Sequence, residues 1–213
     1  MSEILLLAFE IAGTVAFAVS GALLGLEKRM DILGISILGL TTAVGGGVIR
    51  DIILGITPPM TFRNPLYAAI AIGVSVLVFV IVRKRSLFKG RFYEITMLIM
   101  DSTGLGVFTV IGINTAFVRD DSYGIFLLVF VGVMTGVGGG ILRDVMAGDR
   151  PYIFVKHFYA SASIIGAVVC VAVWDVLGSI TSMFVGTAVV IVLRLCAARF
   201  RWSLPKVQDP SDQ

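Results

Sequence analysis

Apolar runs as long as a lipid bilayer is thick fill almost the whole chain. A spanning helix needs roughly 20 mainly apolar residues, and the runs are separated only by short turns rich in Pro, Arg, Lys or Asp. With 57% hydrophobic and 15% charged residues, the chain cannot cover a water-soluble surface. The sequence predicts an all-α integral membrane protein with seven transmembrane helices, at 4–26, 32–54, 65–82, 95–118, 123–147, 152–173 and 176–196.

The basic residues gather on one side of these seven predicted spans. If successive spans alternate in direction, only Arg63 and Arg119 fall on the other side. Cytoplasmic turns collect Lys and Arg, which predicts an N-terminus outside and a cytoplasmic C-terminus. Because the basic residues sit between apolar runs, we expect membrane lipids and no nucleic acid as partners. The predicted cytoplasmic set is Lys28, Arg29, Arg83, Lys84, Arg85, Lys89, Arg91, Arg150, Lys156, Arg199, Arg201 and Lys206.

A ten-residue segment occurs twice in nearly the same form. Residues 42–51 read TAVGGGVIRD, and residues 135–144 read TGVGGGILRD. Each copy belongs to a unit of three predicted spans, and an odd number of spans makes the second unit enter the membrane from the opposite face. We therefore predict a first three-helix repeat at 1–93, an inverted repeat at 94–175, and a seventh transmembrane helix with a cytoplasmic tail at 176–213.

The repeat extends to single residues before and after the glycine-rich segment. One helix earlier, Glu10, Gly13, Phe17 and Gly21 have the spacing of Asp101, Gly104, Phe108 and Gly112. A proline follows each glycine-rich helix, Pro58 or Pro151, and each is followed by a Tyr-Ala pair that begins at Tyr67 or Tyr159. Inverted repeats with interrupted helices place a solute site near the bilayer midplane, so this pattern indicates transport or permeation.

The triple glycines predict kinks in the second and fifth transmembrane helices. Glycine lowers helix propensity by roughly 1 kcal/mol per residue, so these helices should bend or unwind and expose carbonyl groups that can bind a desolvated cation. The alternative is that the glycines only let two helices pack closely. The predicted ion path contains Gly45, Gly46, Gly47, Gly138, Gly139 and Gly140.

An Arg-Asp pair follows each triple glycine, at Arg50-Asp51 and Arg143-Asp144. Charges inside a membrane need partners, and neighbouring residues on a helix point in different directions, so partners on other helices are expected. Residues of matching depth offer them. The predicted charge pairs, with a structural or a gating role, are Glu10 with Arg50 and Asp101 with Arg143.

Polar residues at membrane depth could add ligands to the ion path, although most hydroxyl groups in such helices bond to their own backbone. The chain has a single histidine, His157, and no recognisable nucleophile motif, so we expect no enzyme activity, no metal site and no cofactor. Cys170 and Cys196 read as small buried residues. The polar candidates are Ser20, Thr41, Thr42, Ser102, Thr103, Asn114 and Thr135.

The paired GGGxxRD segments in a seven-span chain with inverted repeats resemble the prokaryotic branch of the trimeric intracellular cation (TRIC) channel family. Its bacterial sequences are also grouped under a glycine-transporter domain name. The resemblance covers nearly all of residues 4–196. It implies a homotrimer in the inner (plasma) membrane, with a pore for monovalent cations, above all K⁺, between kinked helices 2 and 5 of each subunit. Animal members carry a basic gating motif where this chain has Arg-Asp, so their lipid and calcium regulation is not carried over.

A second function of a different class fits the same pattern. The chain could be a secondary carrier for glycine or another small neutral amino acid, with broken helix ends binding the carboxylate and ammonium groups. The channel is favoured because the expected cavity offers few fixed groups for an amino-acid carboxylate.

Overall fold

The computed structural model describes residues 2–84, 90–155 and 158–202, and this part of the chain is helical apart from turns. Caps and glycines set several helix ends. Asp31 accepts a hydrogen bond from the backbone N–H of Gly34 at 2.7 Å and so caps the second helix. The helices are α1 (Ser2–Glu27), α2 (Ile32–Ile53), α3 (Met60–Arg63), α4 (Leu66–Lys84), α5 (Arg91–Arg119), α6 (Ile125–Met146), α7 (Tyr152–Val155), α8 (Ala160–Ala172), α9 (Trp174–Leu177) and α10 (Ser179–Phe200).

Six of these helices are long and apolar enough to cross a membrane, namely α1, α2, α4, α5, α6 and α10. The predicted span at 152–173 is not one helix, because Phe158 has a positive φ of 63° between α7 and α8. The 13 residues of α8 extend only about 20 Å, less than the roughly 30 Å hydrocarbon core. Six spans are confirmed, and the seventh stays a prediction.

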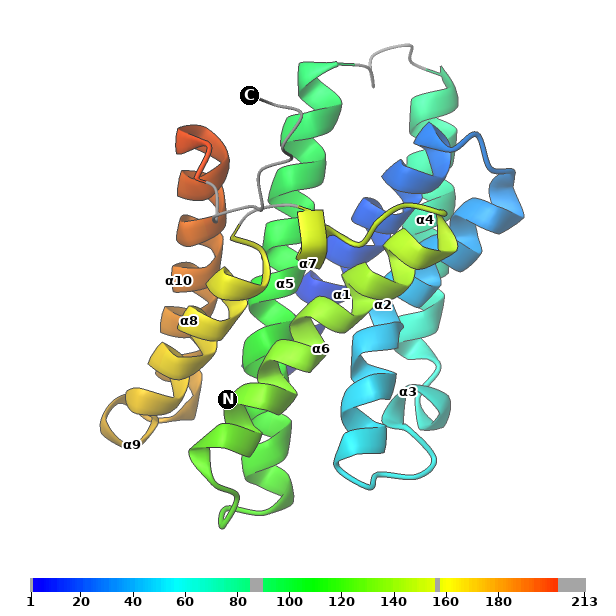
Figure 1. The fold of residues 1–213 in the computed structure, drawn as a ribbon. Helices are drawn as coiled ribbons and strands as arrows, with labels where there is room; N and C mark the ends of the chain where they lie inside the picture. Colours follow the sequence, from blue (N-terminus) through cyan, green and yellow to red (C-terminus); the bar gives the residue numbers. More distant parts are fainter. Residues whose placement is uncertain (1, 85–89, 156–157, 203–213) are drawn as a thin grey trace, which may run out of the picture.

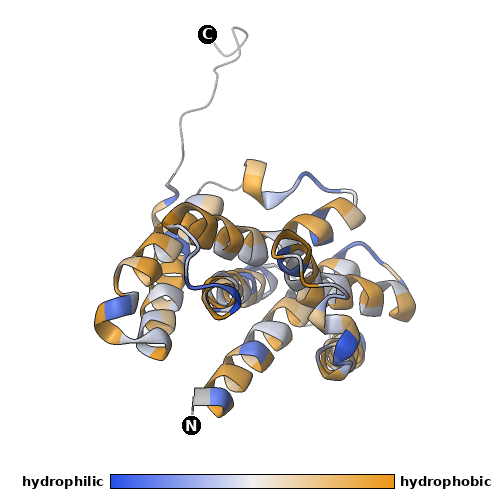
Figure 2. Ribbon diagram, turned by 90° about the horizontal axis from the view of Figure 1, so that it is seen from below, coloured by the Kyte–Doolittle hydropathy of each residue, from blue (hydrophilic) through white to orange (hydrophobic). Residues whose placement is uncertain are grey.

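The central helix of the fold is α5, which packs against α1, α6, α8 and α10. The ends of the helices fall into two groups (Figure 1). The turns after α1 and α6, the start of α5 and the end of α10 lie together at the end drawn uppermost, whereas α3, α9 and the turn between α5 and α6 lie at the other. Figure 2 shows mainly hydrophobic helices, with hydrophilic residues chiefly in the turns.

We call the uppermost end in Figure 1 the basic end, because its turns and helix ends carry Lys28, Arg29, Arg150 and Arg199. Arg63 and Arg119 belong to the opposite end, so the predicted separation of charge is present among the described residues. The side of the membrane that each end faces stays a prediction. Arg85, Lys89, Lys156, His157 and Lys206 lie outside the described residues.

Candidate ion path

Helices α2 and α6 cross in backbone contact at their triple glycines. A Cβ atom added to Gly46 would lie 2.1 Å from the carbonyl oxygen of Thr135, and one added to Gly139 would lie 2.2 Å from that of Thr42. Both helices stay continuous through the glycines. The predicted unwinding is therefore wrong, since packing of the two backbones compensates for the low helix propensity of glycine. A bend without unwinding stays a prediction.

The first glycines of the two triplets have equivalent surroundings, whereas the third glycines do not. Gly45 packs against the side chain of Leu142, and Gly138 packs against the side chain of Ile49, the matching residue of the other motif. Gly47 faces open space, with its nearest atom to an added Cβ, a nitrogen of Arg50, 3.9 Å away. Its counterpart Gly140 is covered by the hydroxyl of Tyr159, 2.6 Å from an added Cβ. The space beside Gly47 is therefore open, whereas the space at the matching position beside Gly140 is filled.

The two repeat threonines bond to their own helices. Thr42 donates to the carbonyl of Leu38 at 2.6 Å, and Thr135 donates to that of Val131 at 2.6 Å. Both are buried at the α2–α6 crossing. Asn114 instead lines a separate cavity of about 150 Å³ on another face of α5, so the structure does not bring it to the glycines.

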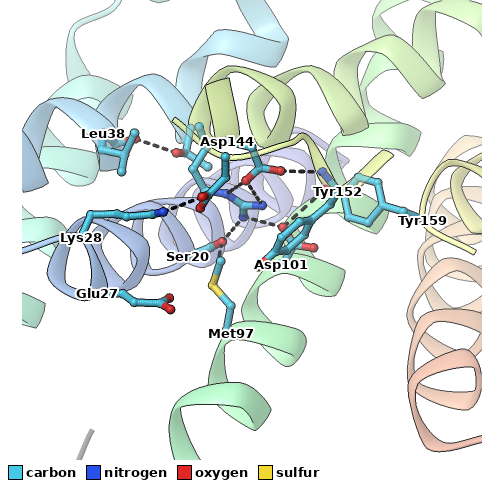
Figure 3. Close-up of polar contacts among 12 residues, drawn as sticks. Ser20, Glu27, Lys28, Leu38, Met97, Asp101, Asp144, Tyr152 and Tyr159 are labelled. Atoms are coloured by element: carbon cyan, nitrogen blue, oxygen red, sulfur yellow. Dashed lines mark hydrogen bonds and ion pairs between the residues drawn. The ribbon is translucent and has the colours of Figure 1, made fainter. Parts of the chain in front are cut away.

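A buried charge cluster joins α5 and α6 (Figure 3). Arg143 Nη1 donates to Asp101 Oδ1 at 2.6 Å, which confirms the predicted Asp101–Arg143 pair. The same nitrogen also donates to Ser20 of α1, so Ser20 belongs to this charge cluster. The hydroxyl of Tyr159 lies 3.4 Å from Asp101 Oδ1. The arginine is fully buried, and a buried charge at membrane depth requires partners. These contacts supply them.

Each of the two motif arginines also binds the aspartate that follows it. Arg50 Nε donates to Asp51 Oδ1 at 2.8 Å, and the second motif repeats the contact at 2.8 Å between Arg143 and Asp144. The prediction that neighbouring residues would not pair is wrong, because Nε and Nη2 of each long arginine side chain reach the carboxylate of the next residue. The second aspartate oxygens accept the backbone N–H of Met60 and of Tyr152, so both motifs also anchor the segment after their helix.

The predicted Glu10–Arg50 pair is absent. Among the described residues no ion pair joins these two side chains; Arg50 pairs with Asp51, and the hydroxyl of Tyr67 donates to Glu10. Matching depth placed Glu10 and Arg50 beside the same cavity, but the partner of Glu10 lies on α4 and the partner of Arg50 on its own helix.

Arg194 of α10 is a member of the buried cluster that the repeat analysis missed. Its side chain is 4% exposed, its Nη2 lies 3.5 Å from Asp101 Oδ2, and its guanidinium stacks 4.7 Å from the ring centre of Tyr159. The signal was a lone charge within an apolar run, which demands a partner. For Tyr67 and Tyr159 the signal was the repeated Tyr-Ala pair.

Two cavities lie toward opposite ends of the molecule, and only the first is lined by a glycine of the crossing. The first, of about 130 Å³, is lined by residues that include Glu10, Gly47, Arg50 and Tyr67, and reaches Phe108. With the Asp51 that binds Arg50 included, the formal charge of its side chains is −1. The second, of about 90 Å³, is lined by residues that include Asp101 and Arg194.

Aromatic rings pack against the glycine crossing beside the first cavity. Phe17 and Phe108 stack with their ring centres 5.3 Å apart, and Phe17 also packs against Gly139 at the crossing. A hydrophobic constriction of this kind can block ions by excluding water. Such a constriction lies where the first cavity ends, at Phe108.

At the basic end, an ion pair ties the turn after α1 to the turn after α6. Lys28 Nζ lies 2.5 Å from Asp149 Oδ1. This hydrogen bond and the charge of Asp149 raise the pKa of Lys28 above its usual 10.5, so the lysine stays charged at physiological pH.

Comparison with protein families shows a match to the glycine transporter family model over residues 7–83 and 98–175. The chain is 39% identical to the UPF0126 inner membrane protein YadS of Escherichia coli K12 over 198 residues, which cover 92% of this chain and 93% of that protein. It is 31% identical to the UPF0126 membrane protein YvgT of Bacillus subtilis over 92% of this chain and 93% of that protein.

Among solved structures, the fold is similar to that of bacterial TRIC channels. The TRIC trimeric intracellular cation channel orthologue from Rhodobacter sphaeroides matches with a TM-score of 0.84 and 31% identity, over 92% of this chain and 98% of that one. A prokaryotic TRIC channel in 0.5 M KCl matches with a TM-score of 0.87 and 29% identity, over 96% of this chain and all of that one.

Proposed function

The chain belongs to the glycine transporter family of integral inner membrane proteins, and from this premise we propose that it is a K⁺ channel. Its similarity to TRIC cation channels supports a cation channel. In our proposal the protein is a homotrimer, and each subunit has its own pore between α2 and α6. The repeats at 1–93 and 94–175 are inverted, the N-terminus lies outside, and the basic end is cytoplasmic.

The observation that carries this proposal is the negatively charged cavity that ends at the glycine crossing. Its carboxylate, Glu10, is held by Tyr67 rather than neutralised by Arg50, so a cation is favoured over an anion in it. The cavity is in contact with Gly47 and Phe108, next to the constriction. Ions would cross when α2 and α6 move apart and water fills the space between the two cavities.

The buried charge cluster acts as the closed gate in this proposal. The hydroxyl of Tyr159 fills the space at Gly140 that is open at Gly47, and Arg143 lies beside it in the same cluster. Their partner Asp101 belongs to α5, so the cluster connects the central helix to α6. Opening would require these side chains to rearrange while Arg143 keeps a carboxylate partner, because an unpaired buried arginine is too costly.

A carrier for glycine or another small neutral amino acid remains the second candidate. The description of the matched family favours it, and the first cavity holds both a carboxylate, Glu10, and a guanidinium, Arg50. These groups could bind the ammonium and carboxylate ends of an amino acid. The channel is preferred because Arg50 is already bound by Asp51.

Planar bilayer recording under a KCl gradient, with and without glycine on one side, tests the two functions. Discrete current steps that reverse near the K⁺ potential and ignore glycine are expected, while protein-free bilayers treated with the same detergent stay silent. Silence with the protein present, together with counterflow uptake of labelled glycine into proteoliposomes, would identify a carrier and refute the channel.

A further inference from the structure

A groove of about 740 Å³ lies between the start of α5 and the end of α10, at the basic end. Three exposed arginines line it, Arg91, Arg199 and Arg201, and Glu94 is the only acidic side chain among its lining residues. With the buried Arg194, the formal charge of the lining side chains is four minus one, that is +3. Such a concentration of positive charge favours an anionic ligand.

The rest of the groove is apolar. Ile95, Leu98 and Leu195 line it beside Trp202, whose ring stacks with that of Phe200 at a centre distance of 6.4 Å. Tryptophan is enriched at the level of lipid headgroups. The groove therefore combines a charged part suited to a headgroup with an apolar part suited to an acyl chain.

Arg194 connects this groove to the buried cluster. It lines both the groove and the cavity beside Asp101. Although buried, its Nε has no hydrogen-bond partner within the described part of the chain, and an unsatisfied buried donor is unfavourable. The amino end of α5 adds positive character beside it, because its N-cap, Gly90, offers no side-chain hydrogen bond. Both observations indicate that a further acceptor binds here.

We propose that the groove between α5 and α10 binds the phosphate headgroup of an anionic phospholipid. Arg91, Arg199 and Arg201 contact the headgroup, and Arg194 forms the positively charged base of the site. Basic pockets between transmembrane helices at the cytoplasmic side are suited to such lipids. This site is distinct from the α2–α6 crossing, and the inference holds whether the protein is a channel or a carrier.

Native mass spectrometry of the delipidated protein, titrated with phosphatidylglycerol in a neutral detergent, tests the site. Each arginine near a membrane surface contributes about 1 kcal/mol to anionic lipid binding, or about fivefold in affinity. The double variant R199Q/R201Q should therefore bind the lipid about 25-fold more weakly than the parent chain. The matched control is R83Q/R150Q, which loses the same charge outside the groove and should bind as the parent does.

Three results would overturn the proposal. Equal weakening in both double variants would mean general electrostatic attraction, and equal affinity for phosphatidylcholine would mean that charge is not recognised. Displacement of the lipid by inorganic phosphate at the same concentration would mean a site for free phosphate. Because Arg199 and Arg201 are exposed, the variants should fold, and an unchanged size-exclusion profile verifies this before the titration.

Discussion

Asp101 and Arg143 form a fully buried ion pair of 2.6 Å between α5 and α6, whereas their repeat counterparts Glu10 and Arg50 do not pair with each other, since Arg50 pairs with Asp51. The difference divides the molecule into a half closed by charge pairing and a half with an open, negatively charged cavity.

Removing Arg143 should destabilise the protein far more than removing Arg50. Arg143→Gln leaves both Asp101 and Asp144 buried without a full partner, and breaking a buried ion pair typically costs about 3–5 kcal/mol. Arg50→Gln leaves only Asp51 without its arginine partner, so it should lower the free energy of unfolding by less. Thermal unfolding in detergent measures both, and adding Asp101→Asn to Arg143→Gln should recover part of the loss. Equal losses for the two arginines would contradict the asymmetry.

Glu10 should be energetically coupled to Tyr67 rather than to Arg50. A hydrogen bond to a charged group contributes about 1.5–3 kcal/mol, so a double-mutant cycle with Glu10→Gln and Tyr67→Phe should show coupling in that range. The matching cycle with Arg50→Gln should show a smaller value. The reverse order would restore the Glu10–Arg50 pair that the sequence suggested.

Alanine should be tolerated at Gly73 and not at Gly46. The new methyl group at Gly46 would lie 2.1 Å from the Thr135 carbonyl, whereas nothing lies within 4 Å at Gly73 of α4. Overpacking typically costs about 1–3 kcal/mol, while glycine to alanine in an open helix gains up to about 1 kcal/mol. Melting temperatures of the two variants, with Gly139→Ala as a second crossing variant, test this. A neutral Gly46→Ala would mean that the helices can separate freely.

Glu10→Gln should reduce cation conduction if the first cavity lies on the ion path. Loss of one charge near a passing ion is worth about 1 kcal/mol in a wet site, roughly a fivefold drop in local K⁺. Single-channel K⁺ conductance should fall, and the reversal potential in a KCl gradient should move toward zero. Glu3→Gln, the same change in the separate Asn114 cavity, is the control. If both variants conduct like the parent, the path does not pass Glu10.

The glycine triplets and the charged residues show how far the sequence could predict this site. Their positions along each helix predicted that the candidate site lies on α2 and α6 and that Asp101 pairs with Arg143. Position along a helix gives depth but not the direction of each side chain, so Tyr67 was missed as the partner of Glu10. Arg194 was missed because the repeat contains no equivalent of α10.

The sequence by itself determined the membrane environment, the six confirmed spans and the repeated motif, because apolar length and residue spacing are local properties of the chain. Only the tertiary structure decided what the glycines do. Their low helix propensity predicted a break, but the close crossing of α2 and α6 supplies backbone packing that a single helix cannot provide. The separation of open and closed halves likewise depends on contacts between distant segments, such as Tyr159 over Gly140.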